Sequence, residues 1–265
     1  MARALSQLRY RLTLAWVDHG HRASAKDEGV FVQSLAATLS VPFISLSAHP
    51  VTTSEAGLRD ARYQVLDSVD GDVIATAHTA SDQAETVLMR MIRGAGTTGL
   101  AGIPDVRGRY VRPLLGVTRQ EVMEYLNSLQ QEYAVDPTNA SLEPLRNRIR
   151  HTLIPLLESQ FQPRIVQSLQ RLAELARLDR DTLEYLAHDH VLKHGAEIEA
   201  MRGVPAGIRR YVLRILCPVP LSLERSHALE QLVIGKVQGI IELESACVAR
   251  TEAGVVRFEI RHVSD

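Results

Sequence analysis

The sequence predicts an α/β protein, in which a parallel β-sheet with crossover helices is followed by a mainly helical region and a C-terminal β-hairpin. Three observations support this prediction. In the first half of the 265 residues, short apolar runs typical of strands alternate with apolar residues at helical spacing. Strands that are joined by helices pair in parallel with right-handed crossovers. Strand patterns then stop until about residue 240, where two of them flank the turn sequence Thr-Glu-Ala-Gly.

The elements of the first half follow from local patterns. The expected strands are residues 11–17, 41–46, 72–77 and 110–111, and the expected helices are 28–39, 55–69, one from about residue 80, and 118–129. We expect the strand before residue 78 to be short and buried. Thr79 with Asp82, and Thr118 with Glu121, match the capping box, in which a hydroxyl residue and an acid three positions later bond each other's backbone amides. These two pairs therefore mark helix starts.

The second half reads as helices and a closing hairpin. The expected helices are 146–160, 163–190, 205–216 and 223–234, and the expected strands are 240–250 and 255–262. In the last strand, Val256, Phe258 and Ile260 alternate and are expected to face inward. Because the strand signal stops in mid-chain, we expect one domain over residues 1–160 and a second over residues 161–265.

The composition is that of an ordinary globular protein. Hydrophobic residues make up 45% of the chain, and the formal net charge is -1. No apolar run approaches the roughly 20 residues of a membrane-spanning helix, and there is no signal-peptide core, so we expect no membrane association. Cys217 and Cys247 are the only cysteines, which argues against a disulfide framework or a cysteine-based metal site. The expected location is a reducing cytoplasm.

Arginine is concentrated in the middle of the chain despite the low net charge. The cluster comprises Arg146, Arg148, Arg150, Arg164, Arg171, Arg177 and Arg180. It is either a set of solvated helix faces or a surface that follows phosphates, and the planar guanidinium of arginine favours the second interpretation. Composition alone leaves both open.

The main candidate site lies where the expected strand 72–77 meets the next helix. In a parallel α/β sheet, ligands bind outside the carboxyl ends of the strands, so we expect His78, Asp82 and Glu85 to line that crevice. Asp82 and Glu85 are three residues apart and share a helix face. The alternatives are carboxylates that only stabilise the helix N-terminus, and a histidine with a structural role.

Other residues have side chains or backbones suited to phosphate. They are Arg59 and Arg62 on helix 55–69, Arg93, Gly94 and Gly96 in a glycine-rich turn, and Arg146, Asn147 and Arg150 near a helix start. The glycines allow the backbone to approach a phosphate or base, or they simply end a helix. Arg62 lies on the apolar helix face, so a buried ion pair is the alternative for it. Amides and guanidinium groups at a helix start together form an anion site.

Five sequence blocks occur in an order that resembles one known family. They are VDHGHRASAKDE, SEAGLRDARY, HTASDQAETVLMRMIRGAGTTGLAGI, RPLL and DPTNASLEPLRNRIRHTLIPLL, and they extend from about residue 12 to residue 157. Together they resemble the tRNA(Ile)-lysidine synthetases of the N-type ATP pyrophosphatase, or PP-loop, superfamily. This resemblance implies a Rossmann-like domain of the adenine-nucleotide α-hydrolase type. The part after residue 160 looks like the tRNA-contacting region of that family.

The resemblance also implies an activity. Members of the family use ATP to adenylate the C2 oxygen of the wobble cytidine in an isoleucine tRNA with a CAU anticodon, and then attach lysine through its ε-amine. The expected cofactors are therefore ATP and Mg²⁺, and the expected partners are that tRNA and lysine. The sequence does not indicate an oligomeric state.

Residue roles follow from the resemblance together with the chemistry above. They are catalysis for Asp82, Glu85, His78, Arg59 and Arg62, nucleotide binding for Asp18, His19, Arg22, Arg93, Gly94 and Gly96, tRNA contact for Arg146, Asn147 and Arg150, and a metal ligand at Asp82. Pyrophosphate is the leaving group of an adenylation, so basic side chains and a divalent cation would neutralise its charge.

One departure from the family is large. The SGGxDS-type loop, which holds the ATP pyrophosphate in the family, does not occur in these 265 residues. Residues 1–10 resemble the end of the helix that should follow the loop. A late start codon, a truncated chain and a decayed paralogue would each explain this, and the helical apolar pattern of residues 1–10 favours the first. The chain as written is therefore expected to lack lysidine synthesis, because nothing in it holds the pyrophosphate.

Three other functions remain as alternatives. A noncatalytic tRNA-binding paralogue would bind RNA without turning over ATP. A metal-dependent hydrolase would use His78, Asp82 and Glu85 as ligands, although a convincing set of partners is absent from the sequence. A tRNA thiolase is related in chemistry, but the cysteine pairs used by such enzymes are missing.

Overall fold

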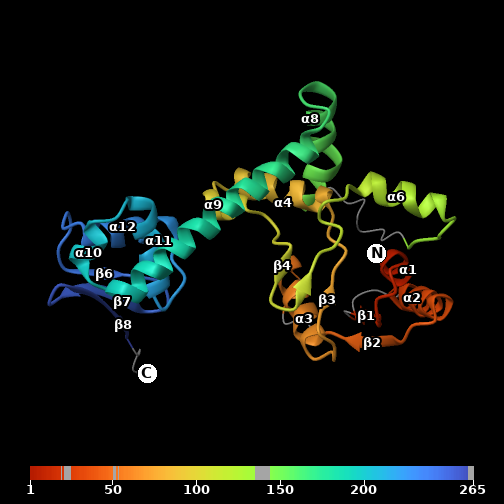
Figure 1. Ribbon diagram of the computed structural model, residues 1–265, viewed down its shortest axis with the longest axis horizontal. Helices are drawn as coiled ribbons and strands as arrows, with labels where there is room; N and C mark the ends of the chain where they lie inside the picture. The colour runs from red at the N-terminus through yellow and green to blue at the C-terminus, as the bar shows by residue number, and fades with distance from the viewer. Residues whose placement is uncertain (19, 21–24, 50–51, 53, 135–143, 262–265) are drawn as a thin grey trace. The chain divides into compact units, whose positions relative to one another are not determined.

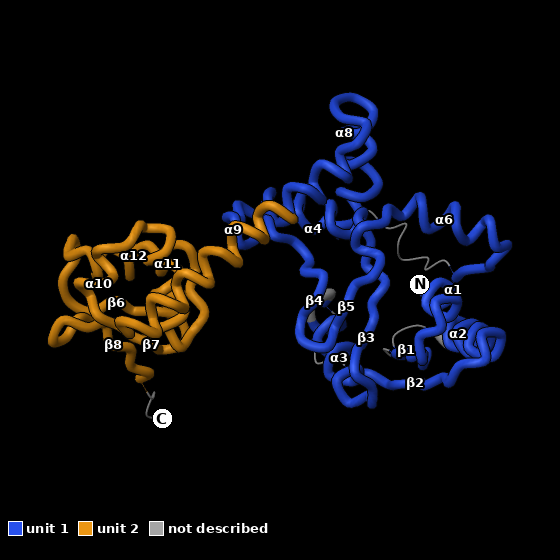
Figure 2. Tube along the Cα trace, in the orientation of Figure 1, with its two compact units in different colours: residues 1–173 blue, residues 174–265 orange. Residues whose placement is uncertain are grey.

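The structure is a computed structural model that describes residues 1–18, 20, 25–49, 52, 54–134 and 144–261. The chain forms two compact units, Met1–Ala173 and Glu174–Asp265, which are coloured separately in Figure 2. The boundary falls inside the long helix α9 (Ile165–His194). The division into domains of residues 1–160 and 161–265, which the sequence suggested, remains a prediction.

The first unit begins with parallel strands on either side of a helix. After α1 (Ala2–Gln7), β1 (Leu14–Asp18) pairs in parallel with β2 (Phe43–Ser47), and α2 (Ala25–Leu39) connects them. The helix packs closely on β1, because a Cβ added to Gly29 would lie 3.1 Å from the ring of Trp16. The strand-helix-strand order predicted for this segment is confirmed.

The next strands form a second small sheet. β3 (Ile74–Ala75) pairs in parallel with β5 (Tyr110–Val111), and β5 pairs in antiparallel fashion with β4 (Val106–Arg107). The expectation that residues 72–77 form a buried strand was wrong, because only two residues are in the strand and Val73 is 56% exposed. Among the described residues β3 pairs with a strand on one side only, so its other edge is not covered by a neighbouring strand. The parallel strands therefore lie in two sheets where the sequence suggested one.

Helices make up the rest of the first unit. They are α3 (Glu55–Asp67), α4 (Ala80–Ile92), α5 (Thr97–Leu100), α6 (Arg119–Ser128), α7 (Leu145–Arg148), the π-helical turn η2 (Ile149–Leu153) and α8 (Ile154–Gln160) (Figure 1). The capping boxes predicted at Thr79 and Thr118 are both present. The π-helical turn lies just before Pro155, which has no amide hydrogen to donate to a regular α-helical ladder.

The core of the first unit joins α4 to the helices that follow residue 145. Ala84, Val87 and Leu88 of α4 belong to one buried cluster with Ile149 and Leu169. Burying these apolar side chains drives the helices together, at roughly 25 cal/mol for each Å² removed from water. Polar residues on the neighbouring face of α4 are thereby placed against the start of α7.

The second unit packs helices on a three-stranded antiparallel sheet. Its elements beyond α9 are α10 (Ile198–Arg202), α11 (Ala206–Leu216), α12 (Leu223–Val233), β6 (Ile240–Glu242), β7 (Cys247–Glu252) and β8 (Val255–Ile260). Met201, Leu213 and Leu229 are fully buried in its core. None of the helices in the described residues is long and apolar enough to cross a membrane.

The C-terminal hairpin was predicted correctly, but two details were wrong. The single strand expected over residues 240–250 is two strands, because Ser245 and Ala246 adopt positive φ angles of 54° and 55° and reverse the chain. Val256 faces inward with 3% exposure, as expected, and Phe258 is half-buried. Ile260 is 54% exposed, because it lies at the last position of β8, where the core ends.

Candidate functional site

The start of α4 holds Asp82 in a fixed position. The amide and the hydroxyl of Thr79 donate hydrogen bonds to Asp82 Oδ2 over 2.9 and 2.8 Å. The amide of Asp82 donates to Thr79 Oγ1 over 3.3 Å. One carboxylate oxygen of Asp82 is therefore committed to the helix end, and Oδ1 has other partners.

Two arginines complete a four-residue network with the acids of α4, which we call the acid-arginine network (Asp82, Glu85, Arg146 and Arg150). Arg150 binds Glu85 in a bidentate manner through the Nε–Nη2 edge of its guanidinium, with Nε 2.6 Å from Oε1 and Nη2 3.0 Å from Oε2. Arg146 bridges the two acids, with Nε 2.7 Å from Glu85 Oε2 and Nη2 2.8 Å from Asp82 Oδ1. From the sequence, the acids and the arginines were assigned to different ligands. The structure brings all four together.

The network is closed on one side and open on the other. Glu85 is 1% exposed, whereas the side chains of Asp82, Arg146 and Arg150 are 20%, 23% and 19% exposed. Two carboxylates and two guanidinium groups have no net charge together. The result is a nearly neutral surface on which positive and negative groups lie side by side within reach of a small ligand.

Electrostatics keeps Asp82 ionised. Burial acts to raise the pKa of Asp82, but the hydrogen bonds from Thr79 and the charges of Arg146 and Arg150 outweigh it and lower the pKa below its usual value. Asp82 is therefore a carboxylate at neutral pH. The suggestion that it merely stabilises the helix N-terminus is incomplete, because it also binds two guanidinium groups.

The geometry fits Mg²⁺ poorly at Asp82. Oδ2 already accepts two hydrogen bonds from Thr79, and Oδ1 lies 2.8 Å from Arg146 and 3.4 Å from Arg150. Mg²⁺ demands near-octahedral oxygen ligands, so it would have to displace these groups. The described residues contain no group of three His, Cys, Asp or Glu side chains that could hold a metal ion. The metal-dependent hydrolase alternative gains no support from them.

His78 is a neutral hydrogen-bonding group. It is half-buried between β3 and α4, and its Nδ1 lies 3.0 Å from the hydroxyl of Thr76. Burial, the largest cause, and the nearby charges of Arg112, Arg59 and Arg146 together lower the pKa of His78 to about 4, against the opposing effect of Asp82. An imidazole with this pKa is uncharged at neutral pH and is a weak base.

The second helix of the candidate site, α3, presents arginines around a tyrosine. Arg59 Nη2 donates to the hydroxyl of Tyr63 over 3.3 Å, and its guanidinium lies 5.1 Å from the centre of that ring. Arg62 is exposed, so the buried ion pair proposed for it is wrong. Arg62 lies on the same side of α3 as the buried Ala61 and Leu66, and partial burial of its guanidinium lowers its pKa.

The glycine-rich turn after α4 is held by side chains of α4. Arg90 Nη1 donates to the carbonyls of Gly99 and Gly102 over 2.8 and 2.9 Å. Gln83, 1% exposed, exchanges hydrogen bonds of 3.0 and 2.6 Å with the backbone of Ile103. A Cβ on Gly102, whose φ is +63°, would lie 2.4 Å from Gln83 Oε1. These contacts give the turn a structural function.

The residues named in this turn lie at the far end of α4 from Asp82. Arg93 is the exposed C-cap of α4, Gly94 follows with a φ of +74°, and Gly96 is the N-cap of α5. Eleven helical positions at 1.5 Å each place Arg93 roughly 16 Å from Asp82 along the axis. Arg93, Gly94 and Gly96 are therefore separate from the acid-arginine network, and nucleotide binding by these residues stays a prediction.

The remaining predicted residues are only partly described. Asp18 ends β1, and its Oδ1 accepts a hydrogen bond of 2.8 Å from the amide of Gly20. His19 and Arg22 lie outside the described residues. Asn147 follows Arg146 in α7 and is half-buried. Their assigned roles in nucleotide and tRNA binding stay predictions.

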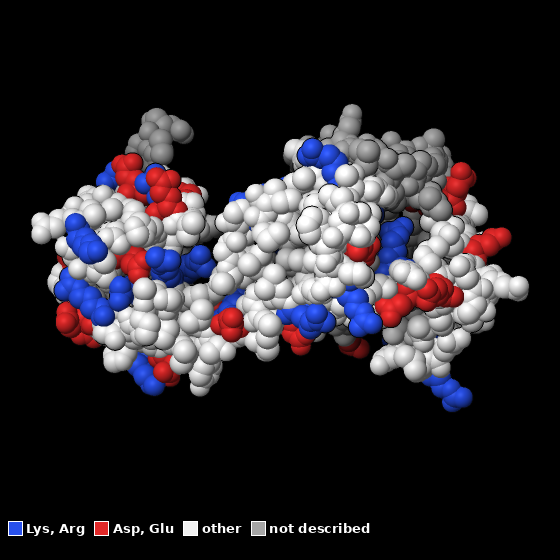
Figure 3. All heavy atoms as spheres, turned by 90° about the horizontal axis from the view of Figure 1, so that it is seen from above, with Lys and Arg blue, Asp and Glu red and all other residues white. Residues whose placement is uncertain are grey.

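The mid-chain arginines are not one uniform surface. Arg146 and Arg150 are in the network, while Arg180 pairs with Asp181 over 2.7 Å. Arg164 and Arg171 are exposed. On the face drawn in Figure 3, basic and acidic side chains are interspersed. At least part of the cluster therefore consists of solvated or internally paired arginines.

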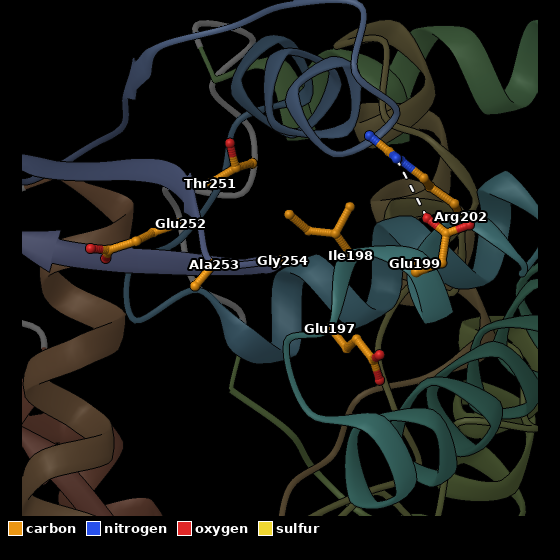
Figure 4. Close-up of a pocket in the computed structure, with 8 residues that line it drawn as sticks. All are labelled: Glu197, Ile198, Glu199, Arg202, Thr251, Glu252, Ala253 and Gly254. Atoms are coloured by element: carbon orange, nitrogen blue, oxygen red, sulfur yellow. Dashed lines mark hydrogen bonds and ion pairs between the residues drawn. The ribbon is translucent and has the colours of Figure 1, made fainter.

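A separate hollow of about 360 Å³ lies in the second unit, between the start of α10 and the β7–β8 turn (Figure 4). Its charged lining includes Glu197, Glu199 and Glu252, with Arg202 3.5 Å from Glu199. The amide of Ile198 donates to the carbonyl of Gly254 over 2.8 Å, which fastens α10 to the hairpin. The acidic lining is unsuited to phosphate.

Sequence reasoning missed Arg112 and Tyr63. Arg112 follows β5 and is 4% exposed, and Tyr63 lies between it and Arg59. Arg112 stands in a loop directly before a proline, where the sequence has no helical or strand periodicity from which its burial could be predicted. The side-chain contacts across 49 residues of sequence are visible only in the fold.

Comparison with known proteins gives consistent relatives. A family model described as PP-loop domain matches residues 1–157. The tRNA(Ile)-lysidine synthase of Geobacter sulfurreducens is 35% identical over 263 residues, which cover 88% of this chain and 55% of that protein. That of Solibacter usitatus is 35% identical, covering 95% of this chain and 59% of that protein. This chain thus spans somewhat more than half the length of these relatives.

A third relative is matched over most of its length, and a solved structure shares the fold. The tRNA(Ile)-lysidine synthase of Thermobifida fusca is 32% identical over 259 residues, covering 91% of this chain and 80% of that protein. The U34-tRNA thiolase NcsA from Methanococcus maripaludis superposes with a TM-score of 0.53 at 18% identity, over 66% of this chain and 68% of that chain. At that identity the likeness shows the fold alone. On the family model and the relatives together, the chain belongs to the tRNA(Ile)-lysidine synthase family of PP-loop domain proteins.

Proposed function

We propose that this chain acts in the ATP-dependent ligation of lysine to the wobble cytidine of an isoleucine tRNA with a CAU anticodon. In the first step the C2 oxygen of the cytidine attacks the α-phosphate of ATP and releases pyrophosphate. In the second step the ε-amine of lysine attacks C2, a carbon–nitrogen bond forms, and AMP leaves with the oxygen. The names of the relatives and the match to the PP-loop domain support this proposal.

The acid-arginine network is the observation that supports the proposal most strongly, because it matches a free amino acid. The α-carboxylate of lysine can replace a carboxylate partner of Arg146 or Arg150, and its α-ammonium can take the place of a guanidinium at Asp82. Charge balance is kept throughout the exchange. Anchoring the α-groups leaves the ε-amine free to react.

Burial suggests a division of roles within the network. Asp82 is 20% exposed and can contact the ligand, whereas Glu85 is 1% exposed and forms ion pairs with both arginines. We therefore propose Asp82 as a binding residue and Glu85 as a positioning residue for Arg146 and Arg150. His78, with a pKa of about 4, is proposed as a hydrogen-bonding contact, because it is too weak a base to take a proton from an ammonium group.

ATP and the tRNA would be bound by other parts of the chain. We propose that Arg59 and Arg62 meet phosphates, and that any Mg²⁺ is held by phosphate oxygens and by ligands other than Asp82. The second unit is proposed to contact tRNA. The reaction would take place in the cytoplasm, where tRNA is modified.

Labelled lysine tests this function. The 265-residue chain and the product of the whole reading frame that encodes it are each incubated with ATP, labelled lysine and a transcript of the isoleucine tRNA. We expect ATP-dependent label in the tRNA with the product of the whole reading frame. A transcript with uridine at the wobble position is the matched control, since it lacks the cytidine that would react, and it should stay unlabelled.

The same assay separates the alternatives. Salt-dependent tRNA binding with no lysine incorporation by either protein would identify a noncatalytic tRNA-binding paralogue and contradict the ligase proposal. Label that enters the uridine transcript equally would contradict the wobble-cytidine assignment. In an active protein, Asp82→Asn should raise the KM for lysine, because it removes the charge that the α-ammonium needs.

A further inference from the structure

Arg112 is a buried cation without a carboxylate partner among the described residues. It is 4% exposed, and its Nη1 donates to the carbonyl of Pro104 over 2.7 Å. Its Nη2 reaches the hydroxyl of Tyr63 over 3.5 Å, the limit of a hydrogen bond. Its Nε has no hydrogen-bond partner. Arginine stays charged in proteins, so this group cannot relieve its burial by losing a proton.

The unfilled part of Arg112 is the edge that normally receives an anion. Nε and Nη2 form the side-on fork of a guanidinium, which matches the two oxygens of a carboxylate or phosphate. Arg146 and Arg150 each use this edge on the acids of α4, with all four distances between 2.6 and 3.0 Å. In Arg112 the same edge holds only the weak contact to Tyr63.

Other cations lie around this edge. Arg59 donates to the same Tyr63 hydroxyl over 3.3 Å, so two guanidinium groups meet at one neutral oxygen. Asp67 accepts a hydrogen bond from the hydroxyl of Tyr110 over 2.5 Å, and among the described residues it forms no ion pair with Arg59 or Arg112. The repulsion between the two guanidinium groups raises the free energy of the site when no anion is bound. A bound anion would lower that free energy.

His78 adds a neutral donor to the same neighbourhood. Its pKa is lowered by burial and also by Arg112 and Arg59, which shows that both cations are near the ring. If the hydroxyl of Thr76 donates to Nδ1, over the observed 3.0 Å, the Nε2–H of the imidazole is available to an oxygen ligand. The group as a whole offers donors and positive charge.

We propose that the side-on edge of Arg112, with Arg59 and the hydroxyl of Tyr63, binds a phosphate group of a substrate. The ligand class is a phosphate ester or polyphosphate. Arg59 is exposed and can move with the entering anion, whereas Arg112 is fixed through Pro104 and defines the site. The proposal deepens the proposed function, because both ATP and tRNA carry such groups, but its test does not need lysine ligation.

The test measures anion binding by Arg112→Gln, with inorganic tripolyphosphate, ATP and the tRNA transcript as separate probes. Arg112→Gln removes the paired, charge-assisted hydrogen bonds from Nε and Nη2. It should therefore weaken the binding of whichever probe occupies the site about ten- to hundred-fold. Arg107→Gln is the matched control, because it removes the same charge from an exposed position on β4 nearby. It should change the binding by less than about three-fold.

The probes identify the source of the phosphate. Weaker binding of ATP and tripolyphosphate with unchanged tRNA binding supports a nucleotide phosphate at Arg112. Weaker tRNA binding alone supports a backbone phosphate. If Arg112→Gln binds all three probes like the parent, or if the parent binds none of them, the proposal is overturned.

Two further variants keep the test decisive if Arg112→Gln fails to fold. Arg112→Lys keeps the charge but loses the fork, and Tyr63→Phe removes only the hydroxyl. Each should weaken the same probe, with Arg112→Lys the more affected. Parent-like binding by both folded variants would show that Arg112 only supports the loop at Pro104. Failure of lysine ligation with intact anion binding would contradict the proposed function and leave this site standing.

Discussion

Removing the charge of Glu85 is the sharpest test of the acid-arginine network. Glu85→Gln keeps the size of the side chain but leaves Arg150 and Arg146 without the carboxylate that accepts three contacts of 2.6 to 3.0 Å. Breaking a fully buried pair costs about 3–5 kcal/mol. The two guanidinium groups are about one fifth exposed and keep Asp82 as a partner, so we expect a smaller loss of about 2–3 kcal/mol.

The free energy of unfolding by urea measures this loss, and a double-mutant cycle isolates the pair. Glu85→Gln, Arg150→Gln and the double variant should show a coupling energy of about 1–3 kcal/mol. The reason is that substitutions within one ion-pair network do not have additive effects on the free energy of unfolding. The control is the i,i+4 pair of Lys193 and Asp189, whose charged atoms are 2.7 Å apart and whose side chains are 62% and 44% exposed. Its coupling should stay below about 0.5 kcal/mol.

The functional consequence is measured in parallel. If Glu85 positions the arginines for lysine, Glu85→Gln in an active protein should lower turnover by roughly 10²-fold. Additive stability effects, with a coupling energy near zero, would refute the reasoning about the network. Unchanged turnover with the expected loss of stability would limit Glu85 to a structural role.

Three other predictions concern single residues. Because the pKa of His78 is lowered to about 4, the folded state binds fewer protons than the unfolded state between pH 6.5 and 4, so stability should fall as the pH falls through this window; an NMR titration of the imidazole with a midpoint near 6.5 would contradict this. Gly102→Ala should destabilise the protein by at least about 1 kcal/mol more than Gly108→Ala, since both glycines have positive φ but only the first has a side-chain atom in the way; equal melting temperatures would disprove the clash. The amide of Ala75 should exchange with solvent hydrogen faster than that of Thr76, which donates to the carbonyl of Val111 over 2.9 Å; slow exchange at both would show that another segment pairs with this edge of β3.

Local features of the fold could be predicted from the sequence. The capping boxes at Thr79 and Thr118 depend on residues three apart, so their geometry is contained in a short segment. The β7–β8 hairpin likewise follows from a turn between two alternating runs. The extent of β3 could not be predicted, because burial of a strand depends on which neighbours cover it.

The candidate site could be predicted only in part. Asp82 and Glu85 were recognised as a pair on one helix face, but their partners are 61 to 68 residues further along the chain. Only the packing of α4 on the helices after residue 145 brings them together. The burial of Arg112 is likewise a property of the fold, and nothing in its immediate sequence indicates it.

The central claim is that a tRNA is activated by adenylation before lysine is attached, and the fate of labelled ATP tests it most directly. The product of the whole reading frame is incubated with the isoleucine tRNA transcript and ATP labelled at the α-phosphate, without lysine. We predict that label enters the tRNA and is released as AMP when lysine is added. ATP labelled at the γ-phosphate should leave the tRNA unlabelled. Label from the γ-phosphate, or lysine attachment that releases no AMP, would contradict the claim.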